Sequence, residues 1–209
     1  MIYVCWADVS GLDESGLSRE LSEYRREKLR LLKPPAARRA GIGAELLLQH
    51  ALRRYRPELS LPPVICRGEN GKPFLAGCDL FFSLSHSGDF AACALSDAEI
   101  GLDIQVPAEA GEGLVRRFLA PGEREYLAAA HDRDSAFSEL WTRKESFVKA
   151  TGKGLAAGLS SFCAVPGAEL QNDGRCYTAY YERFPDFHLA VCYPAEEKQK
   201  IEIEKIELP

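Results

Sequence analysis

Residues 139–154 read ELWTRKESFVKATGKG and combine a helical period with closely spaced charges. Trp141, Glu145 and Lys149 are separated by four positions each, which places them along one face of a helix. The two glycines of TGKG can then close the helix in a left-handed conformation and let a backbone approach a ligand. An exposed Glu–Lys pair at this spacing contributes only about 0.3 to 0.5 kcal/mol. The Glu–Lys pair therefore adds little stability to the helix, and the glycines that follow it are what indicate a ligand site.

A short apolar stretch upstream of this helix, residues 100–105, reads IGLDIQ and predicts a strand. Because side chains alternate along a strand, Asp103 and Gln105 share a face opposite the apolar residues. Their oxygens suit Mg²⁺, although one carboxylate and one amide need a further ligand. Together with the charged helix, this strand predicts a metal-assisted phosphoryl-transfer site.

The chain also contains a local basic segment. Residues 25–39, RREKLRLLKPPAARR, include seven Lys or Arg and one Glu, in a chain of net charge −5. One interpretation is a solvated helix face. The other is an anion site at which Arg25, Lys28 and Arg39 converge on a phosphate, since guanidinium groups make bidentate contacts and an ammonium acts as a point charge.

Two turns carry further polar residues. NGKPFL predicts a turn with Lys72 beside it and Pro73 fixing the exit of the chain. FSLSHSGDFAACAL predicts two strands joined at a turn that carries Ser85 and His86. Hydroxyls, amides and an imidazole at such a turn can hold a phosphate, or they can simply cap the turn.

Composition limits the class of protein. With 46% hydrophobic residues, 209 residues can bury a sizeable core. The net negative charge disfavours general binding to nucleic acid or anionic membranes, and no stretch reaches the roughly 18 apolar residues of a spanning helix. The seven cysteines are scattered and never form C-x-x-C, which argues against a disulfide framework or a zinc site. We expect a cytoplasmic protein.

The order of elements predicts an α+β fold with two similar halves. Two helical segments between residues 16 and 56 precede short strands up to residue 105, and further helices between 114 and 150 precede another set of strands. VPAEAGEG, residues 106–113, has the composition of a linker. We therefore expect an N-terminal half at 1–105 and a C-terminal half at 106–209. FHLAVCY is expected to be a core strand, with His188 and Cys192 packed rather than catalytic.

These motifs, in this order, resemble those of the 4'-phosphopantetheinyl transferases, specifically the type named after the surfactin-synthetase activating enzyme. GKPFL with FSLSHS, then IGLDIQ, then WTRKESFVKATGKGL match, and the last is close to the family signature W-x-x-K-E-S-x-x-K. The resemblance extends from the basic segment to about residue 162. It implies two α+β halves related by a pseudo-twofold axis, with coenzyme A in the cleft between them.

The resemblance also implies an activity. The phosphopantetheine arm of coenzyme A would be transferred, with Mg²⁺, to a serine of an acyl or peptidyl carrier protein, releasing adenosine 3',5'-bisphosphate, as in holo-carrier-protein synthases of fatty-acid, polyketide or nonribosomal peptide synthesis. Glu145 would be the base and a metal ligand with Asp103, and Lys149 would assist departure of the pyrophosphate. Coenzyme A would be held by Lys28, Arg39, Lys72, Pro73, Ser85, His86, Asp103 and Lys149, with His86 near its 3'-phosphate.

One position departs from the commonest family pattern. Where many members have a second acid after the aspartate, this chain has Gln105, which would be a neutral metal ligand or act through a bridging water. The carrier protein would dock against residues 106–119, where Val115, Phe118 and Leu119 could form an apolar contact or could simply be core residues. A monomer is expected. Two alternatives stay open: a coenzyme A or nucleotide-binding module without transfer activity, and a partner-binding scaffold.

Overall fold

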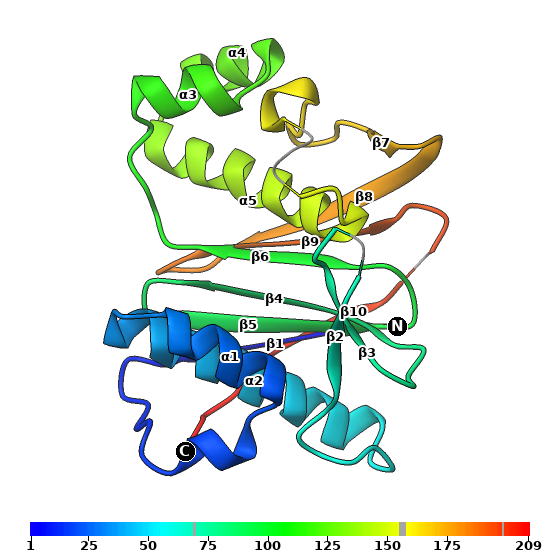
Figure 1. The fold of residues 1–209 in the computed structure, drawn as a ribbon. Coiled ribbons are helices and arrows are strands. Elements are labelled where there is room, and N and C mark those ends of the chain that lie inside the picture. The colour runs from blue at the N-terminus through cyan, green and yellow to red at the C-terminus, as the bar shows by residue number, and fades with distance from the viewer. Residues whose placement is uncertain (69, 155–157, 198) are drawn as a thin grey trace.

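The computed structural model describes residues 1–68, 70–154, 158–197 and 199–209, and it has an α+β fold. Two four-stranded sheets face each other, and a long helix covers the outer face of each (Figure 1). Helix α2, Pro35–Tyr55, packs on the first sheet, and helix α5, Arg133–Thr151, packs on the second. The predicted fold class is confirmed.

The first sheet has the order β10-β1-β5-β4. Its strands are β1 (Ile2–Asp8), β4 (Phe81–Ser87), β5 (Phe90–Ser96) and β10 (Ile201–Lys205). Strand β1 pairs antiparallel with β5 and parallel with β10. Tyr3 and Cys5 lie in the core beneath α2, whereas Ile2 and Val4 lie in the core between the sheets. Both faces of this sheet are buried, which explains why β1 is a nearly continuous apolar run.

The second sheet is antiparallel throughout, with the order β6-β9-β8-β7. Its strands are β6 (Gly101–Gln105), β7 (Leu170–Asn172), β8 (Arg175–Arg183) and β9 (His188–Pro194). Helix α5 lies directly on β6, because a Cβ atom added to Gly101 would be 2.0 Å from the carbonyl oxygen of Ser146. His188 and Cys192 are buried in β9, as the sequence predicts.

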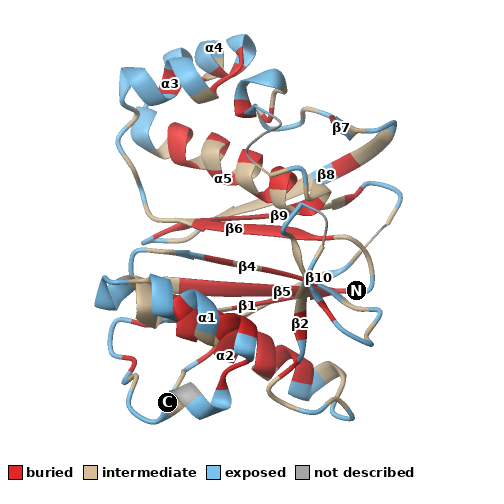
Figure 2. Ribbon diagram, viewed as in Figure 1, coloured by how far each residue is buried: buried red, intermediate tan, exposed pale blue. Residues whose placement is uncertain are grey.

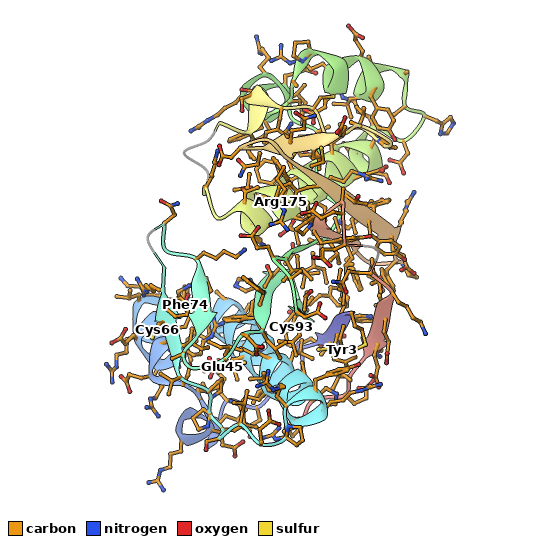
Figure 3. The ribbon with its side chains drawn as sticks, turned by 90° about the vertical axis from the view of Figure 1, so that its right-hand side faces the viewer. Tyr3, Glu45, Cys66, Phe74, Cys93 and Arg175 are labelled. Carbon is orange, nitrogen blue, oxygen red and sulfur yellow. The ribbon has the colours of Figure 1, made fainter. Side chains whose placement is uncertain are left out.

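The smaller elements surround this frame. They are the 3₁₀ helices η1 (Leu17–Glu20) and η3 (Leu159–Ser161), the helices α1 (Glu23–Leu31), α3 (Glu112–Phe118) and α4 (Pro121–Ala129), and the strands β2 (Ile65–Arg67) and β3 (Pro73–Leu75). Strands β2 and β3 form a two-stranded ribbon in which Cys66 and Phe74 are paired (Figure 3). The surfaces of α3 and α4 that face away from α5 are exposed (Figure 2). Among the described residues, no helix is both long and apolar enough to cross a membrane.

The sheets do not follow the expected division between residues 105 and 106. Strand β6 ends at Gln105 but pairs with β9 of the second sheet, and the last strand, β10, returns to the first sheet. Residues 106–111 are irregular, as their composition indicates, but Glu112 and Gly113 already belong to helix α3. However, each strand pairs with partners far away in the sequence, and local composition does not predict which strands pair.

The two sheets meet along β4 and β6, next to the candidate site. The hydroxyl oxygen of Ser83 accepts a hydrogen bond from the backbone N–H of Leu102 at 2.9 Å. Four residues further along each chain segment, the Ser87 hydroxyl oxygen accepts a hydrogen bond from the N–H of Val106, just after β6, at 3.1 Å. Serine side chains on β4 therefore connect the edges of the two sheets, and Ser85 lies between these two connections.

Candidate active site

A pocket of about 340 Å³ opens between the two halves. Its walls come from α1, from the turn before β3, from β4 and from the C-terminal part of α5. The side chains and backbone that line it are Tyr24, Arg25, Lys28, Ala44, Asn70, Gly71, Lys72, Pro73, Phe82, Ser83, Leu84, His86, Glu145, Val148, Lys149, Gly152 and Gly154. Five of these carry basic side chains and one is acidic, so the pocket suits an anionic ligand.

Asp103, Lys149 and Ser85 form a compact polar cluster beside this pocket. The Lys149 ammonium donates hydrogen bonds to Asp103 Oδ1 at 2.7 Å and to Ser85 Oγ at 2.9 Å. The Ser85 hydroxyl donates to the same Oδ1 at 2.7 Å. Asp103 Oδ2 is buried and has no hydrogen-bond partner among the described residues. An unsatisfied buried carboxylate oxygen is costly, which points to a ligand for it.

Glu145 lies one helical turn before Lys149 and faces the same pocket. Burial raises the pKa of its carboxyl group, the nearby Asp103 carboxylate raises it further, and the Lys149 ammonium partly opposes both effects. Two carboxylates and one ammonium therefore share a small, partly desolvated space. Such an arrangement is typical of proton-transfer and metal sites.

The residues present fit one Mg²⁺ ion that brings most of its ligands with it. Mg²⁺ is usually held by one or two carboxylates together with water and substrate phosphates. Asp103, with its unpartnered Oδ2, and Glu145 satisfy that pattern. No three His, Cys, Asp or Glu side chains of the described residues could hold a metal ion by themselves. The amide nitrogen of Gln105 donates to the Val106 carbonyl at 2.9 Å, and a neutral metal ligand would be its other amide atom, Oε1, so the expected part of Gln105 in the metal site stays a prediction.

The wall formed by α1 is basic. Arg25 is buried, and its guanidinium lies 3.5 Å from the Glu45 carboxylate of α2. The Lys28 ammonium lies 4.6 Å from the centre of the Tyr24 ring. Partial burial of its ring, together with the positive charges of Arg25 and Lys149, lowers the pKa of His86.

Arg39 is not among the described residues that line the pocket, although we expected it to hold coenzyme A. It lies on α2, and its Nε atom is buried without a hydrogen-bond partner among the described residues. Arg25 occupies the position facing the pocket instead. The basic segment itself does not distinguish the two, because their orientation depends on how α1 packs against α2.

The side chain of Lys72 lines the pocket, but its ammonium group is hydrogen-bonded to backbone carbonyl groups of other elements. The ammonium donates to the carbonyl oxygens of Ala150 at 2.7 Å and Ile100 at 3.2 Å. Burial lowers its pKa. Lys72 therefore connects the turn before β3 to the end of α5, where a positive charge is favourable. Pro73 lines the pocket beside it.

Comparison with known proteins identifies the family. The family model of the 4'-phosphopantetheinyl transferase superfamily matches residues 99–200. A 4'-phosphopantetheinyl transferase of Bacillus subtilis is 32% identical over 91% of this chain and 91% of its own length. This chain belongs to the 4'-phosphopantetheinyl transferase superfamily. The 4'-phosphopantetheinyl transferase psf-1 of Bacillus pumilus is 34% identical over 75% of this chain and 71% of its own.

A solved structure was also found. The holo-[acyl-carrier-protein] synthase of Thermotoga maritima aligns with 46% of this chain and 62% of its own, at 17% identity. The TM-score of 0.33 is too low to support an argument about this phosphopantetheinyl transferase.

A buried ion pair on the other side of α5 was not foreseen from the sequence. Lys144 is fully buried, and its ammonium lies 2.6 Å from both carboxylate oxygens of Glu123 and 2.6 Å from the Phe162 carbonyl. Glu123 also accepts hydrogen bonds from the backbone of Ala120 and Ala164. In this phosphopantetheinyl transferase the Lys of the K-E-S motif therefore holds α4 and the segment after η3 against α5. In the sequence, the K-E-S motif is the one signal that could have indicated a special role for Lys144.

The expected carrier-binding residues are largely in the core. Val115 and Leu119 are buried in a cluster between α3, α4 and α5. Phe118 is partly buried, with its ring 5.2 Å from that of Trp141 in an edge-to-face arrangement. Because a short helix must bury its apolar side to be stable, Val115 and Leu119 pack inward, and the docking position of a carrier protein stays a prediction.

Proposed function

We propose that this chain transfers the 4'-phosphopantetheine arm of coenzyme A to a serine of an acyl or peptidyl carrier protein in an Mg²⁺-dependent reaction. The other product is adenosine 3',5'-bisphosphate, and the enzyme acts as a holo-carrier-protein synthase. The observation that carries this proposal is the Asp103–Ser85–Lys149 cluster with Glu145 on the wall of a basic pocket. Membership of the family supports the type of group transferred.

The pocket offers separate positions for the two charged parts of coenzyme A. Lys149 lies beside the two carboxylates, where Asp103 and Glu145 would hold Mg²⁺ on the pyrophosphate. The pocket wall toward α1 is lined by Lys28, Arg25 and His86, and no carboxylate of the described residues lines the pocket there. This wall would suit the 3'-phosphate of coenzyme A. Lys72 and Pro73 would form the wall between the halves.

The proposed reaction breaks and forms one phosphorus–oxygen bond. The carrier serine oxygen attacks the phosphorus that bears pantetheine, and the bond from this phosphorus to the bridging oxygen breaks. Glu145 accepts the hydroxyl proton, which its raised pKa makes easier at neutral pH. Lys149 stabilises the negative charge that develops on the leaving phosphate. When bound, Mg²⁺ would neutralise charge on the pyrophosphate oxygens.

Intact-mass spectrometry tests the proposal directly. An apo carrier protein incubated with the enzyme, coenzyme A and Mg²⁺ should gain one phosphopantetheine, about 340 Da, through covalent attachment to serine. Glu145→Ala should abolish the gain, whereas Glu125→Ala on the exposed side of α4 should not. If several classes of carrier protein stay unmodified although the enzyme binds coenzyme A, the chain is a binding module and the proposal is wrong.

A further inference from the structure

The ammonium group of Lys149 occupies the space beside Asp103 in which a divalent cation would be expected. It lies 2.7 Å from Asp103 Oδ1, and the Ser85 hydroxyl donates to the same oxygen at 2.7 Å. Oδ1 thus already has two donors, and only Oδ2 is without a partner among the described residues. Glu145 is close enough for its carboxylate to interact electrostatically with the Asp103 carboxylate and with the Lys149 ammonium.

We propose that Lys149 is an exchangeable cation that keeps Asp103 from binding a divalent metal ion until coenzyme A is present. This inference rests on the proposed function. In the free protein the ammonium neutralises Asp103. When the pyrophosphate enters, the ammonium moves to a phosphate oxygen, and the metal ion binds to the vacated carboxylate together with its phosphate ligands.

The charges at the site require such an exchange. Two carboxylates and one ammonium leave a single net negative charge, which is little for a divalent ion that must give up part of its hydration shell. An ammonium a few ångströms from the metal position also repels the ion directly, because the two like charges interact at an effective dielectric constant of about 20. The protein alone should therefore bind the metal weakly.

The structure also allows the movement. The Lys149 side chain is 30% exposed and lines the pocket, so its flexible stem can turn toward a ligand without disturbing the core. Asp103 is far more restricted, at 7% exposure of its side chain, and Ser85 is buried. Only the lysine of this cluster is free to change partners. Metal and coenzyme A should consequently strengthen each other's binding.

Mn²⁺ binding measured by electron paramagnetic resonance of the free ion tests the exchange without relying on activity. In the absence of coenzyme A, Lys149→Met should bind Mn²⁺ about tenfold or more tightly than the unmodified protein, because the competing charge is gone. Lys149→Arg keeps the charge and should bind as weakly as the unmodified protein. Lys153→Met removes a lysine whose ammonium pairs with Asp173 at 3.0 Å, and it should change nothing.

Added coenzyme A should tighten Mn²⁺ binding to the unmodified protein and change it much less in Lys149→Met. Asp103→Asn in the Lys149→Met background should abolish the tight site, which locates it. Circular dichroism establishes folding, and Lys149→Gln replaces Lys149→Met if the latter does not fold.

Equal Mn²⁺ affinities for the unmodified protein and Lys149→Met without coenzyme A would overturn the inference. Failure of calorimetry to detect any binding of coenzyme A to the folded, unmodified protein would instead overturn the proposed function, so the two failures are distinguishable.

Discussion

Gly101→Ala should destabilise the protein strongly. It should also move Asp103 on β6 away from Glu145 and Lys149 on α5. A Cβ atom at this position would lie 2.0 Å from the Ser146 carbonyl oxygen and 2.2 Å from the Ala150 backbone nitrogen. Both are backbone atoms within α5, so no side chain can turn away to relieve the contact. Helix α5 would have to withdraw from β6 by roughly 1 Å, a gap at which packed atoms lose a quarter to a half of their attraction.

The expected cost is about 3 kcal/mol of unfolding free energy, at the upper end of the usual range for overpacking. Because Asp103 lies on β6 while Glu145 and Lys149 lie on α5, the same displacement should also lower transfer activity well beyond the loss of stability. Urea unfolding followed by circular dichroism measures the first effect, and the carrier mass assay on the folded fraction measures the second.

Gly111→Ala is the matched control, because nothing lies within 4 Å of a Cβ atom there and the backbone φ of −60° suits any residue. It should leave stability within about 0.5 kcal/mol of the parent protein. If Gly101→Ala is no less stable than Gly111→Ala, the close contact between helix and strand does not exist in solution.

Three further predictions concern other parts of the molecule. Lys144→Met should lower the unfolding free energy by about 3 to 5 kcal/mol in urea denaturation, because it leaves the Glu123 carboxylate buried without its partner; a loss below 1 kcal/mol would contradict this. Lys72→Met should weaken coenzyme A binding in calorimetry and speed hydrogen exchange of β2 and β3, because the connection to Ala150 and Ile100 is lost; unchanged exchange would refute the structural role of Lys72. Burial lowers the pKa of His188, so the unfolded chain binds a proton more readily, and stability should fall as pH drops through about 6.5. His188→Gln should reduce this fall in urea titrations between about pH 7 and 5.5, and an identical slope in both proteins would count against it.

The part of the site that the sequence predicted lies on regular elements. Glu145 and Lys149 share a helix face and Asp103 points from a strand, and both assignments follow from the periodicities of these elements alone. The expectations that differ from the structure depend on packing. Arg39 lies on a helix like Arg25, but the way α1 packs on α2 puts Arg25 at the pocket.

The same distinction explains the remaining differences. Gln105 shares the strand periodicity of Asp103, and its amide nitrogen donates to the Val106 carbonyl, so its part in a metal site stays a prediction. Val115 and Leu119 could serve a surface or a core equally well by composition, and contacts with α4 and α5 decide in favour of the core. The return of β10 to the first sheet is a pairing with β1 across nearly the whole chain, which no local pattern reports.

Strand β4 connects the architecture to the chemistry of the site. Ser83 and Ser87 use their hydroxyl oxygens to accept backbone hydrogen bonds from Leu102 of β6 and from Val106 just after it, and so hold the sheet edges together. Ser85, at the intervening position with the same strand orientation, donates its hydroxyl hydrogen to Asp103 instead. The position of Asp103 relative to the first half is therefore fixed on either side by two backbone connections. Lys149 approaches the same carboxylate from α5, so a charge that enters the pocket meets an Asp103 whose position is already set by the junction of the two sheets.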